Sequence, residues 1–161
     1  MPKPHGDKLI NRILKGKERK KATETAINLE KVEISRNIAT DTENIAKGTF
    51  SPLQGFMNQE ELENVLNQKR LPNDLPWTIP IVLDVSEEKA RNFKEGDNLA
   101  LYFQNKPLAL MHLEQKYKFD KEDFAEKTFG TLDTARAKNF GALVTSINAR
   151  EFITEECFSI L

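Results

Sequence analysis

Alternating apolar and polar positions predict several β-strands in this chain, the clearest of them over residues 77–85. Apolar side chains recur there at every second position, the spacing at which the side chains of an extended strand share one face. The residues on that face are Trp77, Ile79, Ile81, Leu83 and Val85. Pro80 falls on the opposite face and has no backbone N–H to donate, so the strand is expected at a sheet edge or a bulge.

Further strands are expected elsewhere in the chain. Residues 99–104 and 108–119 alternate in the same way, and an Asn-Lys-Pro linker that suits a hairpin joins them. Residues 31–34 and 141–147 are shorter apolar runs that also predict strands. The last segment, residues 151–161, fits either a strand or a short helix.

Helices are expected between these strands, and most begin at a residue that suits a helix N-terminus. Residues 16–29 form a charged, helix-prone run. A Ser, Thr, Asp or Asn side chain accepts hydrogen bonds from the first free amides, and a Glu three residues later completes a capping box. The expected caps are Thr40 with Glu43, Asn58 with Glu61, Ser86, and Asp120. Gly48 is expected to end the helix that Thr40 opens, because glycine is common just after a helix C-terminus.

Short helices among strands, one clear hairpin and no βαβ alternation favour an α+β fold around a small, mostly antiparallel β-barrel. A chain of 161 residues is typical of one domain. That length suffices to bury one hydrophobic core without disulfides. We therefore expect a single domain over residues 1–161.

Charge and cysteine content restrict the partners and the compartment. Lysine and arginine number 24 against 25 aspartate and glutamate, a net charge of −1, so no global field attracts nucleic acid or an anionic membrane. Cys157 is the only cysteine, which excludes an intrachain disulfide and fits a reducing compartment. The first residues lack a signal-type apolar core, and no run approaches the roughly 20 apolar residues of a membrane span. We expect a cytoplasmic protein without a membrane partner.

Basic residues gather on one predicted helix and on the predicted hairpin. The helix run consists of Lys15, Lys17, Arg19, Lys20 and Lys21. We interpret it as a solvated helix face, with a phosphate-binding patch as the alternative. On the hairpin, Lys116 and Lys118 accompany Tyr102 and Tyr117. RNA-binding sheets use exposed aromatic residues beside basic ones, but these tyrosines fall in phase with the apolar positions and are expected in the core.

No catalytic, cofactor-binding or metal-binding residue is predicted. His5 and His112 are far apart in sequence, and a zinc site beside the single thiol would need mostly carboxylate ligands, which is unusual. Neither GxxxxGK[ST] nor GxGxxG occurs, so both common phosphate-binding loops are missing from the sequence. Ser51 lacks the Gly-x-Ser-x-Gly context of a nucleophile elbow. No cofactor is expected.

Residues 48–57, Gly-Thr-Phe-Ser-Pro-Leu-Gln-Gly-Phe-Met, are too apolar for an ordinary surface loop and too interrupted for a helix or a strand. Glycine and proline would shape the turns, and the apolar side chains would pack on the core. We interpret the segment as the anchor of a helix-to-barrel junction. The residues of this structural signature are Gly48, Phe50, Ser51, Pro52, Leu53, Gly55, Phe56 and Met57.

This segment resembles the GAFSPLxGFM signature of the ATP sulfurylase (sulfate adenylyltransferase) family. Three other stretches agree with that family in order and spacing. Residues 8–14 are similar to its LVNRVL opening, residues 77–85 to its WPIPIxLxV strand, and residues 129–135 to its xGTxDxAHPGV motif. The resemblance covers about residues 1–135.

The resemblance implies the family's N-terminal domain, a PUA-like pseudo-β-barrel with short peripheral helices. The family enzyme joins ATP and sulfate to give adenosine phosphosulfate and pyrophosphate. It holds its substrates in a second domain, which carries Gln-x-Arg-Asn-Pro, His-x-x-His and Gly-Arg-Asp segments. None of these occurs in this sequence, where the nearest string, Gln68-Lys69-Arg70, continues with Leu71. We therefore expect this chain to be non-catalytic alone.

The sequence departs from the family pattern after Ala135, where Arg-Ala-Lys-Asn at residues 136–139 replaces HPGV. Residues 136–161 are expected to be a divergent tail, either a closing strand of the barrel or a degenerate remnant. The favoured function is an accessory or interaction module in sulfate activation, with a separate catalytic chain or a second copy as partner. The alternative is an RNA-binding PUA-like module, against which the near-zero net charge argues.

Overall fold

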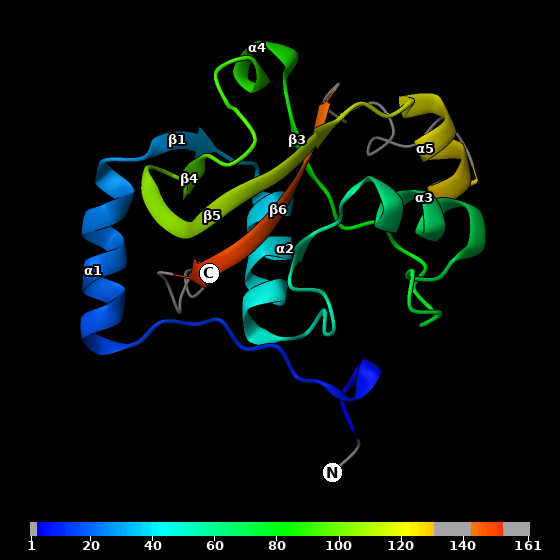
Figure 1. Cartoon of the computed structure of the whole chain (residues 1–161), viewed down its shortest axis with the longest axis horizontal. Helices are drawn as coiled ribbons and strands as arrows, with labels where there is room; N and C mark the ends of the chain where they lie inside the picture. The colour runs from blue at the N-terminus through cyan, green and yellow to red at the C-terminus, as the bar shows by residue number, and fades with distance from the viewer. Residues whose placement is uncertain (1–2, 131–142, 153–161) are drawn as a thin grey trace. The chain divides into compact units, whose positions relative to one another are not determined.

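Residues 3–130 and 143–152 are described by a computed structural model, in which they belong to two units that interleave along the chain (Figure 1). The first unit comprises Met1–Gly55, Gly96–Leu113 and Asn148–Leu161, and the second comprises Phe56–Glu95 and Glu114–Ile147. Expectations for the rest, including most of the motif at residues 129–135 and the end of the tail, lie outside the described residues.

Helices and strands are mixed along the described sequence, which confirms the α+β class. The helices are η1 (His5–Asp7), α1 (Gly16–Ile27), α2 (Arg36–Lys47), α3 (Gln59–Gln68), α4 (Glu87–Ala90) and α5 (Lys121–Phe129). The strands are β1 (Glu30–Glu33), β2 (Gly55–Phe56), β3 (Leu83–Val85), β4 (Asn98–Phe103), β5 (Lys106–Tyr117) and β6 (Leu143–Phe152).

The strands hydrogen-bond in the order β1-β4-β5-β6-β2, and β3 pairs with β6. β1 runs parallel to β4, with Val32 opposite Leu101, whereas β4 and β5 form the predicted antiparallel hairpin. β3 is antiparallel to β6, with Asp84 opposite Val144. Among the described strands this order is an open path that does not return to β1, so the described residues show an open sheet and do not confirm the predicted closure into a barrel.

In the first unit, α1 packs on β4 through small side chains. Ala22 and Ala26 are buried in one cluster with Ala100, Tyr102 and Leu110. The Tyr102 hydroxyl donates a hydrogen bond of 3.3 Å to the Ala26 carbonyl oxygen, and Tyr102 is only 7% exposed. Alanine lets the helix approach the sheet closely enough for that bond. The prediction that Tyr102 belongs to the core is confirmed.

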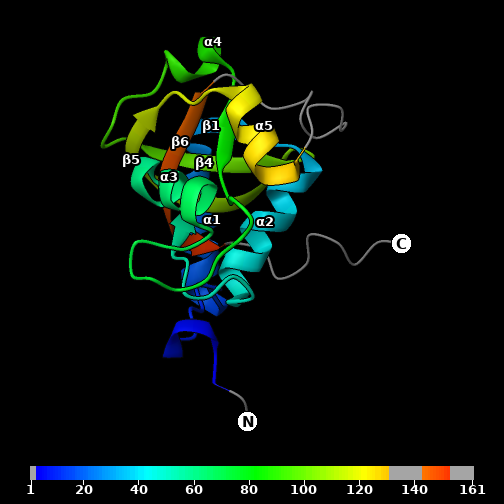
Figure 2. The ribbon, with the colours of Figure 1, turned by 90° about the vertical axis from the view of Figure 1, so that its right-hand side faces the viewer.

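In the second unit, α3 lies beside α5 (Figure 2). The predicted capping box opens α3: the Asn58 side chain accepts from the Glu61 amide at 2.8 Å, and the Glu61 carboxylate accepts from the Asn58 amide at 3.0 Å. At the other end of α3, the Lys69 ammonium donates to the Lys127 carbonyl oxygen at 2.5 Å. The predicted caps at Ser86 and Asp120 are also confirmed.

The predicted capping box of Thr40 and Glu43 is wrong. Helix α2 begins at Arg36, and its N-cap is Ser35, whose hydroxyl accepts from the Ile38 amide. Thr40 lies inside the helix, where its hydroxyl donates to the Arg36 carbonyl oxygen at 3.0 Å. A threonine can bond to the preceding turn in this way, so its presence alone does not mark a helix start.

The predicted strand over residues 77–85 is correct only for β3, its last part. Ile79, expected on the buried face, is 57% exposed, and Ile81, Val82 and Leu83 are buried in succession. Pro76 and Pro80 each lack the N–H that a strand ladder needs. The chain instead bonds locally: the Trp77 amide donates to the Lys69 carbonyl oxygen, and the Trp77 indole donates to that of Ile79.

Left-handed residues form the turn between β4 and β5. Gln104 has φ 50° and Asn105 has φ 63°, and neither is glycine. Because Phe103 pairs with Lys106, these two residues make the whole turn, and two positive φ values define the type I′ hairpin turn that favours Asn-Gly.

The double substitution Gln104→Asn with Asn105→Gly is therefore expected to raise the free energy of unfolding by about 1 kcal/mol, because it relieves the steric cost of left-handed backbone. Thermal unfolding would show a melting temperature higher by roughly 2–4 °C. The matched control, Asn105→Ala, should lower it. An unchanged melting temperature in the first variant would contradict the turn assignment.

Candidate functional site

The N-terminal arm, residues 8–14, is hydrogen-bonded to the end of α2 and to the signature segment. We call this the arm contact. The Arg12 amide donates to the Ala46 carbonyl oxygen at 3.0 Å, and the Arg12 guanidinium donates to the Gln54 side-chain oxygen at 2.8 Å. The carbonyls in the last turn of a helix have no partner within the helix, so the arm satisfies one that α2 leaves open.

Ser51 is the centre of the arm contact. Its hydroxyl donates to the Gly48 carbonyl oxygen at 2.6 Å and accepts from the Ile10 amide at 3.0 Å. The residue is 4% exposed, so water does not replace these bonds. Sequence reasoning placed Ser51 in the structural signature but missed this bond, because the partner amide lies 41 positions away.

Gly48 ends α2 as predicted, in the left-handed conformation with φ 81°. A Cβ atom at this position would lie 2.1 Å from the Ile10 carbonyl oxygen and 2.8 Å from the Leu9 Cδ1 atom. Glycine is therefore required twice, once for the backbone angle and once for the approach of the arm.

The remaining signature residues continue this contact into the chain that follows. Phe50 and Pro52 are partly buried, and Leu53 is buried with its amide bonded to the Phe50 carbonyl oxygen. Gly55 and Phe56 form β2 and are also buried. Gly55 is not among the residues with positive φ, so the left-handed turn of the signature lies at Gly48.

In the second unit, Met57 is held by three hydrogen bonds. Its amide donates to the Ile81 carbonyl oxygen at 2.8 Å, and the Ile81 amide faces the Met57 sulfur at 3.5 Å. The Tyr117 hydroxyl donates to the Met57 carbonyl oxygen at 2.8 Å. Burial raises the pKa of Tyr117 above its ordinary value, and the nearby Glu61 and Glu63 raise it further. The phenol therefore stays protonated and acts as a structural donor.

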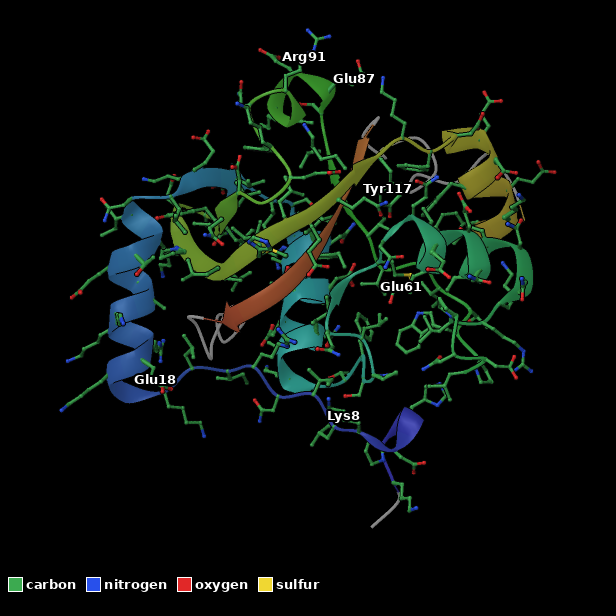
Figure 3. All side chains as sticks on the ribbon, in the orientation of Figure 1. Lys8, Glu18, Glu61, Glu87, Arg91 and Tyr117 are labelled. Carbon is green, nitrogen blue, oxygen red and sulfur yellow. The ribbon has the colours of Figure 1, made fainter. Side chains whose placement is uncertain are left out.

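Glu61 lies near Tyr117 at the start of α3 (Figure 3). Burial raises the pKa of Glu61 above 4.5; the bond from the Asn58 amide opposes that shift, and Glu60 and Glu114 add to it. Within residues 3–130 and 143–152, no group of three or more His, Cys, Asp or Glu side chains is arranged to hold a metal ion. His112 contacts the Asn98 side-chain oxygen through Nδ1 at 3.1 Å.

In both units, buried hydroxyl groups bond to the chain's own backbone: those of Ser51, Tyr102 and Tyr117 each donate to a carbonyl oxygen. Residues 2–139 match the family model of the PUA-like domain, and the chain belongs to that family. No helix within the described part of the chain has the length and apolar character needed to cross a membrane.

The comparison with curated proteins confirms the resemblance to sulfate adenylyltransferase. The chain is 44% identical over 133 residues to the sulfate adenylyltransferase of Hyperthermus butylicus and 47% identical over 131 residues to that of Pyrococcus abyssi. These alignments cover 83% and 81% of this chain but only 34% of each relative. The enzyme of Persephonella marina is 43% identical over the full chain, which covers 41% of that protein. The chain thus spans about a third of the length of its relatives, consistent with their N-terminal domain.

A solved structure shows the same fold. The hexameric APS kinase from Thiobacillus denitrificans matches 99% of this chain and 28% of its own chain, with a TM-score of 0.75 and 20% sequence identity.

The arm contact predicts a specific sensitivity at Gly48. Gly48→Ala and Gly130→Ala both place alanine at a positive φ, which costs roughly 1–2 kcal/mol, but a Cβ at Gly130 meets nothing within 4 Å. Gly48→Ala is therefore expected to cost clearly more free energy of unfolding than Gly130→Ala in denaturant titrations. It should also speed hydrogen exchange at the Ile10 and Arg12 amides. Equal effects of the two variants would contradict a close approach of the arm.

The raised pKa of Glu61 predicts a pH-dependent stability. The folded state binds the Glu61 proton more tightly than the unfolded state does. Protonation of Glu61 therefore stabilises the folded state at low pH, and this stabilisation is lost as pH rises through the folded pKa. Glu61→Gln keeps a capping-box side chain but does not titrate. Its melting temperature relative to the natural chain is expected to increase from about pH 4 to about pH 7. The exposed Glu63→Gln serves as the control, and a pH-independent difference for Glu61→Gln would refute the assignment.

Proposed function

We propose that this chain is a PUA-like module of sulfate activation, non-catalytic alone, that acts through association with other chains. The observation that carries the proposal is the 44% identity over 133 residues to a sulfate adenylyltransferase of which it covers only 34%. Two of the four segments that resemble that family, the arm and the signature, meet in the arm contact.

The reaction of sulfate adenylyltransferases explains why the part of these relatives that this chain does not cover matters. Attack of sulfate on the α-phosphate of ATP brings anions together and needs cationic and hydrogen-bonding groups preorganised around the developing charge. In this sequence the nearest match to a substrate-binding segment is Gln68-Lys69-Arg70. Lys69 donates to the Lys127 carbonyl oxygen, and Arg70 binds the Asp74 carbonyl oxygen at 2.7 Å and its carboxylate at 3.4 Å. These cations therefore already have structural partners.

The further proposals concern the fold, the tail and the compartment. We propose that the sheet closes into a pseudo-β-barrel, that residues 1–161 form a single domain in which residues 136–161 supply a closing strand, and that the protein is cytoplasmic. We also propose a separate catalytic chain as the partner.

RNA binding is less well supported, because Tyr102 and Tyr117 are 7% and 6% exposed and offer no stacking surface.

The purified chain is expected to release no pyrophosphate from ATP and sulfate above background, because it lacks the substrate-binding segments. A coupled pyrophosphate assay measures this, with the sulfate adenylyltransferase of Pyrococcus abyssi as the positive control. Sustained turnover by the chain would refute the proposal that it is non-catalytic alone.

In a pull-down from the source cell, the tagged chain is expected to retain a catalytic adenylyltransferase chain. Repeated absence of that catalytic chain would refute the proposed partner.

A further inference from the structure

We propose that two oppositely charged helix faces, one on α1 and one on α3, bind each other between copies of this chain. The basic face is Lys17, Lys20 and Lys21 on α1, and the acidic face is Glu60 and Glu63 on α3. The proposal does not depend on the role in sulfate activation, because it rests on charge alone.

The lysines of the basic face are all exposed, and within the described residues none of them forms an ion pair. Lys15 is the N-cap of α1 and supplies no side-chain bond to the free amides. A helix N-terminus carries partial positive charge, so lysines there oppose the helix dipole. Glu18 in the first turn and Glu24, four positions after Lys20, offset part of this cost, so the face is basic in net charge but not uniformly basic. Figure 3 shows the side chains of α1 projecting outward from the helix.

The acidic face concentrates the opposite charge. The sequence of α3 holds three glutamates and no basic residue. Glu60 and Glu63 are exposed, and none of the three forms an ion pair within residues 3–130 and 143–152. Burial raises the pKa of Glu61, and the nearby Glu60 and Glu114 raise it further, so negative charge gathers around this end of α3.

The two faces match in spacing as well as in sign. Lys17 and Lys20 lie three positions apart, as do Glu60 and Glu63, and side chains at that spacing are neighbours about 5–6 Å apart on a helix. Because the net charge is only −1, whole copies repel each other weakly. The balance of positive and negative charges also means that the chain as a whole does not attract a polyanion such as RNA. A basic face on one copy and an acidic face on the next make a heterologous contact, which produces chains or rings.

Charge reversal on each face tests this contact in the full chain. Sedimentation velocity over a concentration series is expected to show self-association that weakens at least about tenfold between roughly 0.05 M and roughly 0.5 M salt. Lys17→Glu, Lys20→Glu and Lys21→Glu together should abolish it, as should Glu60→Lys with Glu63→Lys. An equimolar mixture of the two variants should associate again, because each carries a face complementary to the other. Lys3→Glu, Lys89→Glu and Lys106→Glu together give the same net charge as the basic-face variant but lie outside both faces, and they should retain association.

Thermal stability distinguishes a variant that has lost the contact between copies from a variant that no longer folds. The basic-face variant should keep a cooperative thermal transition, because Lys17, Lys20 and Lys21 are all exposed and exposed substitutions usually change stability little. If the lysines on α3 unfold the second variant, Glu60→Gln with Glu63→Gln replaces it and should weaken association without reversing it. A natural chain that stays monomeric at low salt, reversal variants that associate normally, or a mixture that does not recover would each overturn the proposal. Salt-sensitive RNA binding by the basic face without self-association would overturn it as well.

Discussion

A single buried hydroxyl, that of Ser51, joins two parts of the chain that are 41 positions apart. It donates a hydrogen bond to the Gly48 carbonyl oxygen and accepts one from the Ile10 amide. The hydroxyl, the carbonyl and the amide therefore all have partners at a site that water does not reach. Leaving a buried amide or carbonyl without a partner costs about 1–3 kcal/mol. The end of α2, the position of the arm and the path of the chain into β2 all depend on this group. The left-handed turn at Gly48 provides the space in which the arm and the hydroxyl meet.

Sequence patterns correctly predicted the elements that are determined by residues close together in the chain. The capping box of Asn58 and Glu61 was correct because both partners lie within one helical turn. The alternation over residues 77–85 failed because prolines at positions 76 and 80 remove ladder donors, a constraint that outweighs apolar spacing. Thr40 looked like a cap because its hydroxyl can accept an amide bond, yet inside a helix the same hydroxyl donates to the preceding turn.

The signature segment shows where sequence reasoning stops. Its glycine and proline content correctly indicated a shaped, anchored turn, and Gly48 ends the helix as expected. What the segment anchors was not readable, because the bond from the Ile10 amide to Ser51 depends on how the chain folds back on itself. The resemblance to a known family marked both the arm and the signature, but only the coordinates show that the two form one contact.

The described residues use their buried polar chemistry to hold backbone in place. Lys116 places its ammonium 3.0 Å from the Ala90 carbonyl oxygen and 2.6 Å from that of Phe93, at the end of α4. Tyr117 donates to Met57 in the same manner. A site that activates two anions needs such donors aimed at substrate, whereas these donors are aimed at backbone carbonyl groups. Both helices also carry exposed charge: α1 holds Lys17, Lys20 and Lys21 together with Glu18, and α3 holds Glu60 and Glu63. Because the buried donors bond to backbone, contacts of the described residues with other molecules would be made by such surface groups.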